Sequence, residues 1–334
     1  MKASNAAAVP ALECRGLERR FGGLVALKDA NLRIERGEIF GLVGPNGSGK
    51  TTMTNAITGF FPPQVGSIWL NGRDITGMAP HKVAALGVAR TFQNLALFNG
   101  MSVLDNILLG RHIHMKPGVA KTALYWWLGR KDEMASRLKV EEIIDFLQLQ
   151  SVRDELVDSI PIGLKKRVEL ARALVAEPSF LVLDEPMAGM NQEEKEYMAR
   201  FILDARAERN VTVLLIEHHM DVITGICDRM MVLSYGETIG TGIPADVMKD
   251  ERVIKAYLGG AHAKHLNQCC RGQQHHMGYG HRHHPHPHSG SQRRVAGQSR
   301  GHARKAPGNM AGDHLVADAG YHARLRGRHG KPGF

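Results

Sequence analysis

A glycine-rich segment able to hold phosphate runs from Gly44 to Thr51. It follows the pattern G-x4-G-K-[ST], in which a wrapped backbone presents its amides to phosphate oxygens at a helix N-terminus. Lys50 would add a cation between the β- and γ-phosphates, and Thr51 a hydroxyl for Mg²⁺. The segment therefore predicts binding of a nucleoside triphosphate. The candidate nucleotide-binding residues are Gly44, Pro45, Asn46, Gly47, Ser48, Gly49, Lys50, Thr51 and Thr52.

Two adjacent carboxylates follow an apolar run that ends at Leu183. In open α/β sheets, ligands bind at the carboxyl ends of the strands, where Asp184 and Glu185 would lie. Asp184 would hold Mg²⁺ through a water molecule, and Glu185 would face the attacking water as a general base or polariser. Downstream of a phosphate loop, this pair indicates hydrolysis of the bound nucleotide.

Short apolar runs alternate with helix-period segments and would position these residues. The alternation predicts a mainly parallel sheet with helices on both faces. Residues 1–36 and 66–72 instead predict antiparallel strands with turn glycines. The segment from about 89 to 162 is mostly helical, including 102–110 and 132–149, with a linker at 115–118. The apolar runs are 38–43, 179–184, 211–217 and 230–233, and a helix is expected over 51–57 after the phosphate loop.

The composition is that of a folded chain that does not cross a membrane. Of 334 residues, 43% are hydrophobic and 23% are charged, which excludes fibrous and wholly disordered classes. No apolar run approaches the roughly 18 residues that a membrane helix needs. The N-terminus lacks the apolar core of a secretory signal, so we expect the chain to stay in the cytosol. The cysteines have neither zinc nor disulfide spacing, so reduced thiols are expected at Cys14, Cys227, Cys269 and Cys270.

The net charge of +10 lies in the last part of the chain. From Ala261 onward there are 12 Lys and Arg against 2 Asp and Glu, with 13 of the 18 His and no Ile. A segment so poor in branched apolar residues cannot offset the entropy of ordering, so we expect 260–334 to be disordered. Such tracts can bind zinc, nickel, nucleic acid or anionic lipid. We favour the interpretation that this tail is an unstructured or out-of-frame extension of the gene.

Residues 10–259 resemble, over essentially their whole length, a nucleotide-binding subunit of an ATP-binding cassette (ABC) transporter. The resemblance implies an α/β fold of the P-loop NTPase type, with a mainly parallel core sheet, an N-terminal antiparallel β subdomain and a helical insert at about 90–162. In that family a glutamine that reaches Mg²⁺ and the water matches Gln93, the switch histidine matches His218, and the aromatic residue that stacks on adenine matches Phe21. The ordinary alternatives are a core position for Phe21, a solvated turn for Gln93 and a satisfied strand-end histidine for His218.

The family's signature, Leu-Ser-Gly-Gly-Gln, is largely lost, and only Gly163 is kept. Pro161 replaces the serine that would touch the γ-phosphate of the partner subunit, and Leu164 replaces the glutamine. Pro161 fits ahead of a helix start, and the amides of Gly163 and Leu164 would still face an anion. Each lost hydrogen bond to a charged group is worth about 1.5 to 3 kcal/mol, so we expect a weakened dimer that still hydrolyses ATP. Lys165 and Lys166 would compensate electrostatically or form a solvated basic face, and we favour the second.

Other segments are similar to the ATPase subunits of the bacterial branched-chain amino-acid importers. They are 20–27, 92–98, 110–131, 256–259 and 185–191, the last with Asn191 where most cassettes carry Asp. The resemblance implies that two cassettes close head to tail on two ATP with Mg²⁺. Each nucleotide would lie between Lys50 and Glu185 of one chain and Gly163 of the other, and the metal would be held by Thr51, Gln93 and Asp184.

The implied partners are a second ABC ATPase subunit, identical or paralogous, two transmembrane permease subunits and, indirectly, a periplasmic solute-binding protein. No nucleic acid is expected. The chain would be peripheral at the cytoplasmic face of the inner membrane. The alternatives are an importer for urea or short amides, a lipopolysaccharide-export-type system, and a hydrolysis-weak regulatory cassette, which Pro161 and Leu164 motivate.

Overall fold

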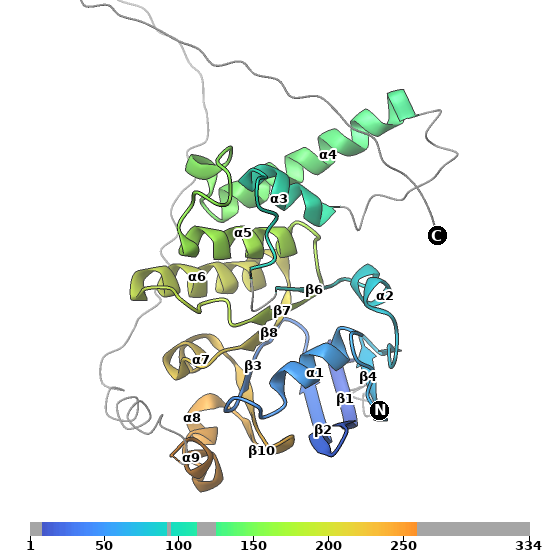
Figure 1. Cartoon of the computed structure of the whole chain (residues 1–334), viewed down its shortest axis with the longest axis vertical. Helices are drawn as coiled ribbons and strands as arrows, with labels where there is room; N and C mark the ends of the chain where they lie inside the picture. Colours follow the sequence, from blue (N-terminus) through green and yellow to red (C-terminus); the bar gives the residue numbers. More distant parts are fainter. Residues whose placement is uncertain (1–8, 92–94, 112–124, 259–334) are drawn as a thin grey trace, which may run out of the picture. The chain divides into compact units, whose positions relative to one another are not determined.

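The computed structural model of the chain describes residues 9–91, 95–111 and 125–258 (Figure 1). Its larger sheet has six strands, parallel except for the β9–β10 hairpin, so the expected mainly parallel core sheet is confirmed. The strand order is β10 (Glu237–Gly242), β9 (Arg229–Ser234), β3 (Ile39–Val43), β8 (Thr212–Ile216), β7 (Phe180–Asp184) and β6 (Val88–Arg90).

A four-stranded antiparallel sheet lies beside this core, as the N-terminal pattern and the turn glycines predict. Its order is β2 (Leu24–Ile34), β1 (Leu12–Phe21), β4 (Val65–Leu70) and β5 (Arg73–Asp74). Gly66 shows why a glycine is needed there: its φ is +93°, and a Cβ would lie 2.4 Å from the carbonyl oxygens of Arg15 and Gly16.

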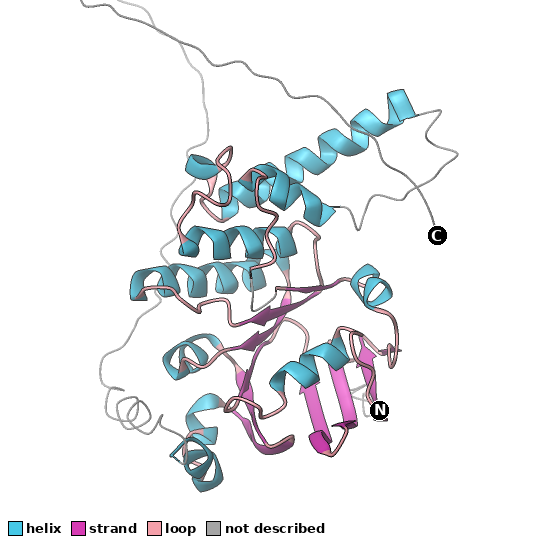
Figure 2. Ribbon diagram, viewed as in Figure 1, coloured by secondary structure: helices cyan, strands magenta, loops and turns pink. Residues whose placement is uncertain are grey.

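Helices cover both faces of the six-stranded sheet (Figure 2). The described helices are α1 (Lys50–Ile57), α2 (Pro80–Ala85), α3 (Val103–Leu109), α4 (Tyr125–Phe146), α5 (Ile162–Leu174), α6 (Gln192–Arg209), α7 (Met220–Ile226), α8 (Pro244–Val247) and α9 (Glu251–Leu258), with a 3₁₀ turn at Gln150–Val152. Of these, α3 and α4 pack on α5.

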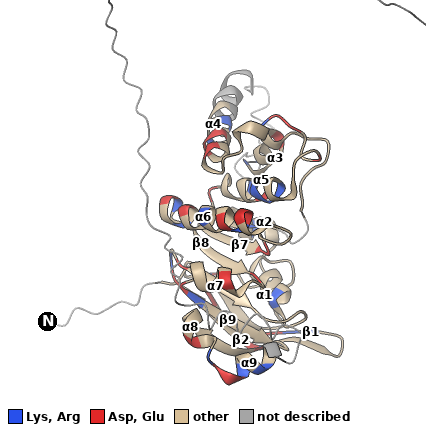
Figure 3. Ribbon diagram, turned by 90° about the vertical axis from the view of Figure 1, so that its left-hand side faces the viewer, with Lys and Arg blue, Asp and Glu red and all other residues tan. Residues whose placement is uncertain are grey.

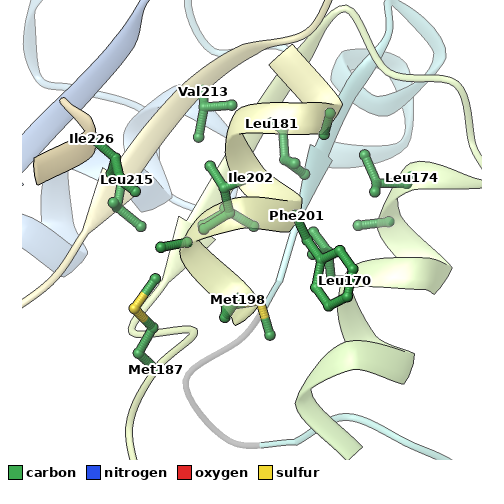
Figure 4. Packing of buried hydrophobic residues seen from close by; sticks show 14 of the residues in the cluster. Leu170, Leu174, Leu181, Met187, Met198, Phe201, Ile202, Val213, Leu215 and Ile226 are labelled. Atoms are coloured by element: carbon green, nitrogen blue, oxygen red, sulfur yellow. The ribbon is translucent and has the colours of Figure 1, made fainter. Parts of the chain in front are cut away.

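The side chains of the core strands alternate between two apolar clusters, because successive residues of a strand point to opposite faces. In β7, Leu181 and Leu183 pack with α3 to α9, whereas Phe180 and Val182 pack with α1, α2 and the antiparallel sheet. Figure 4 shows the first cluster, where residues of α5 and α6 meet the sheet. The clusters hold the carboxyl ends of the strands in place, and the candidate site lies there.

The structure differs from the sequence expectations in the helical insert. Val88–Arg90 pairs with β7 as the edge strand β6, so the expectation that the helical segment starts near residue 89 is wrong at its first residues. Helix α4 begins at Tyr125 rather than near residue 132. The segment 102–110 is helical from Val103 to Leu109, with Ser102 as its N-cap. The linker at 115–118 and the tail at 260–334 lie outside the described residues.

Charged residues are dense along α6, while β8 has none (Figure 3). Among the described helices, none combines the length and the hydropathy that crossing a bilayer requires. Cys14 and Cys227 are buried free thiols, and burial raises the pKa of both. The expectation of reduced thiols is therefore confirmed at these positions, and Cys269 and Cys270 lie outside the described residues.

Candidate functional site

The phosphate loop follows β3, whose five residues are all buried. Its glycines have backbone angles that other residues rarely adopt, with φ at +151° for Gly44, +77° for Gly47 and +110° for Gly49. A Cβ on Gly44 would lie 2.3 Å from the carbonyl oxygen of Leu233, and one on Gly49 would lie 2.6 Å from that of Ala26. The loop is therefore clamped between β2 and β9, and it can take this form only with glycine at these positions.

Helix α1 follows the loop directly, and its N-cap is Gly49. No side chain caps this N-terminus, and no acidic residue occupies the first turn. The first amides of a helix have no partner within the helix and carry its positive dipole end. The N-terminus of α1 is thus open to an anion, as the loop pattern predicts.

The side chain of Lys50 is folded back onto the loop. Its Nζ donates hydrogen bonds to the carbonyl oxygens of Gly44, at 2.7 Å, and Pro45, at 3.0 Å. Burial lowers the pKa of Lys50, and the carboxylates of Glu185 and Asp184 oppose that effect. The structure therefore brings the lysine of the first motif and the carboxylates of the second within electrostatic reach.

A buried polar atom in the loop points to an oxygen-rich ligand. Ser48 is only 2% exposed, and its Oγ has no hydrogen-bond partner among the described residues. Buried hydroxyls in proteins are almost always hydrogen-bonded, because desolvation without a partner is costly. A phosphate in the loop would supply the acceptor. The side chain of Thr51 is exposed at the start of α1.

The second half of the site lies at the end of β7. Asp184 is 7% exposed, and Glu185 turns the chain sharply with a φ of +51° while its amide donates to the carbonyl oxygen of Ile216 at 3.0 Å. Nε2 of His218 lies 2.5 Å from Oε1 of Glu185. A carboxylate only accepts, so Nε2 is the donor in this contact. Two residues that the sequence analysis named separately, Glu185 and His218, are therefore in direct contact.

The structure places three further polar side chains beside these residues, and the sequence pattern did not single them out. Nη2 of Arg90 lies 2.8 Å from Oδ2 of Asp184, and both side chains are less than one-tenth exposed. Glu217, 1% exposed, accepts hydrogen bonds from the amides of Met187, at 2.9 Å, and His218, at 3.2 Å. It also lies 3.1 Å from Nδ1 of His219, and this hydrogen bond raises the pKa of His219. The available signal was a Glu directly after an apolar run and before two histidines.

Phe21 lies at the end of β1 and is 41% exposed, so the alternative of a core position is wrong. Its ring meets Phe61 edge to face, with centroids 5.9 Å apart. The guanidinium of Arg19 lies 4.9 Å from the centre of the Phe21 ring. An exposed aromatic ring beside a cation can stack on a nucleobase.

The altered signature segment begins α5, with Pro161 as the N-cap, as its position before a helix predicts. Gly163 is buried against α6: a Cβ there would lie 2.2 Å from Oε1 of Glu194. The solvated basic face we favoured is wrong for Lys166, which is 5% exposed, with Nζ 3.9 Å from Glu169. Nζ of Lys165 instead donates to the carbonyl oxygen of Asp158 at 3.2 Å.

A cavity of about 520 Å³ opens beside β6. Its walls are mostly apolar and come from α2, β6 and α5, with a few charged residues among them. Arg90 and Thr58, which lie within hydrogen-bonding distance of each other, are among the residues that line it. Gln93 follows β6 but lies outside the described residues.

The described residues fit a divalent cation only together with a nucleotide. Among them, no group of three or more His, Cys, Asp and Glu side chains is placed to hold a metal ion by itself. Mg²⁺ prefers oxygen ligands and is commonly held by one or two carboxylates plus substrate phosphates. The hydroxyl of Thr51 and the carboxylate of Asp184 are donors of this kind.

Comparison with protein families gives two matches. Residues 27–188 match the family described as "ABC transporter". Residues 237–263 match the family described as "Branched-chain amino acid ATP-binding cassette transporter".

Curated relatives match about three quarters of the chain. The high-affinity branched-chain amino acid transport ATP-binding protein BraF of Pseudomonas aeruginosa is 38% identical over 256 residues, which are 75% of this chain and 99% of that protein. The protein LivG of Escherichia coli, of the same description, is 36% identical over 252 residues, again 75% of this chain and 99% of that protein.

Solved structures show the same fold. A nucleotide-free ATP-binding cassette from an ABC transporter superposes with a TM-score of 0.65 at 29% identity, covering 75% of this chain and all of that one. The ADP conformation of an ABC transporter cassette gives 0.66 at 30% identity, covering 75% of this chain and 99% of that one.

Proposed function

The chain belongs to the ATP-binding subunits of ABC transporters, and from this premise we propose that it powers the import of branched-chain amino acids. As a member of this family it is an ATPase. The observation that supports the ATPase part of the proposal is the contact between Glu185 and His218 at the carboxyl edge of the sheet, where the loop after β3 has the phosphate-binding pattern. The substrate class rests on the match at residues 237–263 and on the relatives, since solute does not touch a subunit of this kind.

We propose the following division of work among the residues of the site. The amides from Gly47 to Thr52 and Nζ of Lys50 bind the phosphates, and Lys50 exchanges its bonds to Gly44 and Pro45 for bonds to phosphate oxygens. Glu185 orients the attacking water and accepts its proton, and His218 fixes the Glu185 carboxylate. Phe21 stacks on the adenine. A change at Glu185 should therefore lower the rate of ATP turnover much more than it lowers the affinity for ATP.

We propose Thr51 and Asp184, together with Gln93, as the residues that hold Mg²⁺. When bound, the metal would supply positive charge against the negative charge that develops on the phosphates. Asp184 is held in position for this task by Arg90 and by the end of the buried strand β7.

We propose that two cassettes, identical or paralogous, close on two ATP. In this arrangement the N-terminus of α5 faces the γ-phosphate held by the partner. Pro161 and Leu164 donate no side-chain hydrogen bond there, so the backbone amides of α5 and the helix dipole supply the contact. A hydrolysis-weak regulatory cassette is the second candidate function, and the loss of the signature serine and glutamine is the observation that favours it.

We propose the cavity beside β6 as the docking site of a permease segment. Its walls are mostly apolar, it is large enough for side chains of a partner helix, and it is bounded by β6, which leads into the segment that carries Gln93. The other proposed partners are a second permease and, indirectly, a periplasmic solute-binding protein. The cassette would then lie at the cytoplasmic face of the inner membrane.

The test is purification of the tagged chain from its native membranes in mild detergent, followed by mass spectrometry of the proteins that accompany it. We expect two polytopic permeases, a second cassette and a periplasmic amino-acid-binding protein. Recovery of the chain alone, or with ribosomes or nucleic acid, would contradict the importer. If the chain co-purified with components of a urea importer or of a lipopolysaccharide-export system, branched-chain amino acids would be the wrong substrate class.

A further inference from the structure

Arg90 joins three parts of the nucleotide site. Its Nη2 donates to Oδ2 of Asp184 at 2.8 Å. Its Nη1 donates to Oδ1 of Asn55 in α1 at 2.6 Å and lies 3.4 Å from Oγ1 of Thr58. Arg90 itself is the last residue of β6. One guanidinium thus ties the helix of the phosphate loop, the metal-holding carboxylate and the edge strand together.

These contacts are made away from water. The side chains of Arg90 and Asp184 are 8% and 9% exposed. A buried ion pair of this kind fixes geometry strongly, because leaving either charge without its partner is costly. The planar guanidinium can hold two acceptors at once, which a lysine ammonium at the same position cannot do with the same geometry.

The same side chain also faces the cavity beside β6. Arg90 and Thr58 both line this cavity, which therefore reaches the hydrogen bonds that hold Asp184. A segment that enters the cavity would press on β6 and on the guanidinium. Packed interiors transmit such displacements because they have few voids.

We propose that Arg90 is a positioning residue that couples occupancy of this cavity to the placement of the Asp184 carboxylate. The inference rests on the proposed function, in which the cavity receives a permease segment. Arg90 acts through Asp184 and touches neither nucleotide nor solute. The permease would thereby adjust the metal-holding carboxylate through Arg90.

The first experiment measures ATP binding by the full-length chain while Mg²⁺ is titrated, with a fluorescent ATP analogue as the probe. Arg90→Lys keeps the charge but gives up the simultaneous hold on Asn55 and Asp184. We expect the Mg²⁺ concentration at half-saturation to rise about tenfold, the size typical when a residue that orients a metal ligand is changed. Binding without Mg²⁺, which depends on the phosphate loop, should be unchanged.

The matched control is Arg172→Lys. Arg172 lines the same cavity and is half-buried, but its guanidinium donates to the carbonyl oxygen of Ala96 rather than to Asp184. The Mg²⁺ titration of this variant should follow that of the unchanged chain. Asn55→Leu removes one acceptor of Arg90 and leaves the ion pair, so it should shift the titration in the same direction by less.

The second experiment measures ATPase stimulation in the purified transporter relative to the isolated chain. Arg90→Lys should still co-purify with the permeases while losing most of the stimulation. Equal stimulation of the variant and the unchanged chain, or a Mg²⁺ titration that Arg172→Lys shifts as much as Arg90→Lys, would overturn the inference. Absence of stimulation in the unchanged transporter would instead contradict the proposed function, so the two failures are distinguishable.

Discussion

At the scale of single residues, the site consists of a few polar groups that the buried strands hold in contact. The backbone of Glu185 is fixed by the hydrogen bond of its amide to Ile216, and its carboxylate is held by Nε2 of His218 at 2.5 Å. A carboxylate that is already held in one position can orient a water molecule without first changing its rotamer. The catalytic role of Glu185 is therefore the claim that a single substitution tests most simply.

Replacement of Glu185 by Gln keeps the size of the side chain and removes the proton acceptor. We expect ATP turnover to fall by about 10² to 10⁴, the range of general base catalysis, while ATP binding is retained. Phosphate release and equilibrium nucleotide binding measure the two quantities. Glu193→Gln, on the exposed face of α6, is the control and should leave both unchanged. Equal turnover of the Glu185 variant and the unchanged chain would rule out this residue as the base.

Gly163 is the one signature residue that this chain keeps, and the structure gives a steric reason. The space for a Cβ is filled by the carboxylate of Glu194, whose other oxygen accepts from the amide of Asn191 in a capping box. The glutamate cannot swing away without loosening the start of α6. The start of α5 and the loop before α6 are thus in contact through this glycine.

Gly163→Ala should therefore lower the free energy of unfolding by about 1 to 3 kcal/mol, as overpacking does. Gly225→Ala is the matched comparison, because Gly225 lies inside α7 with nothing within 4 Å of the added Cβ. It should raise stability by about 0.5 to 1 kcal/mol. Urea unfolding followed by circular dichroism compares the two. If the Gly163→Ala variant were as stable as the unchanged chain, the glycine would not be required for steric reasons.

At the scale of elements, the short motifs could be predicted from sequence because each is a strand followed by a loop. The phosphate loop follows β3, and Asp184 and Glu185 lie at the carboxyl end of β7, as the sequence pattern predicts. The alternation of strands and helices in the core and the N-terminal antiparallel sheet could be predicted for the same reason. What determines these features is local: hydrophobic period, glycine and the residues at strand ends.

The contacts between elements could not be predicted in this way. Arg90 and Asp184 lie 94 positions apart, and β6 has only three residues, too few for a period of two to be recognised. Lysine is usually a surface residue, so the sequence favours exposure of Lys166, but the orientation of α5 buries it beside Glu169. The Arg90–Asp184 contact and the burial of Lys166 both result from tertiary packing, which no local sequence pattern encodes.

The connection from β8 to α7 carries a pH-dependent contact. Hydrogen bonding to Glu217 raises the pKa of His219 above 6.5, its ordinary value. A raised folded-state pKa adds stability that is fully present below the unfolded-state value and is lost as the pH rises through the folded-state value. Stability should therefore decline as the pH rises from about 6.5 upward.

His219→Gln should remove this part of the pH dependence. Urea unfolding at a series of pH values from about 6 to 8.5 measures it, since that interval spans the neutral titration of histidine. His81→Gln, at an exposed position of α2, is the control and should keep the slope. A slope that persists in the His219 variant would contradict the assignment to this residue.

At the scale of the whole molecule, the described part of the chain has its own core. The apolar clusters draw on every described layer, and Val253 in α9 is the last residue in them. We expect a chain that ends at Gly260 to keep its unfolding midpoint and its ATP affinity. Differential scanning calorimetry and nucleotide titration of the shortened and full-length chains test this expectation. A large loss of either property would give the segment 261–334 a structural role.

The central claim is that ATP hydrolysis at Glu185 drives uptake of branched-chain amino acids. The most direct measurement is uptake of radiolabelled leucine by cells in which the chromosomal copy carries Glu185→Gln, with urea and an acidic amino acid as comparison solutes. The account predicts that leucine uptake by this route is lost while uptake of the comparison solutes continues. Unchanged leucine uptake, or loss of urea uptake instead, would contradict it.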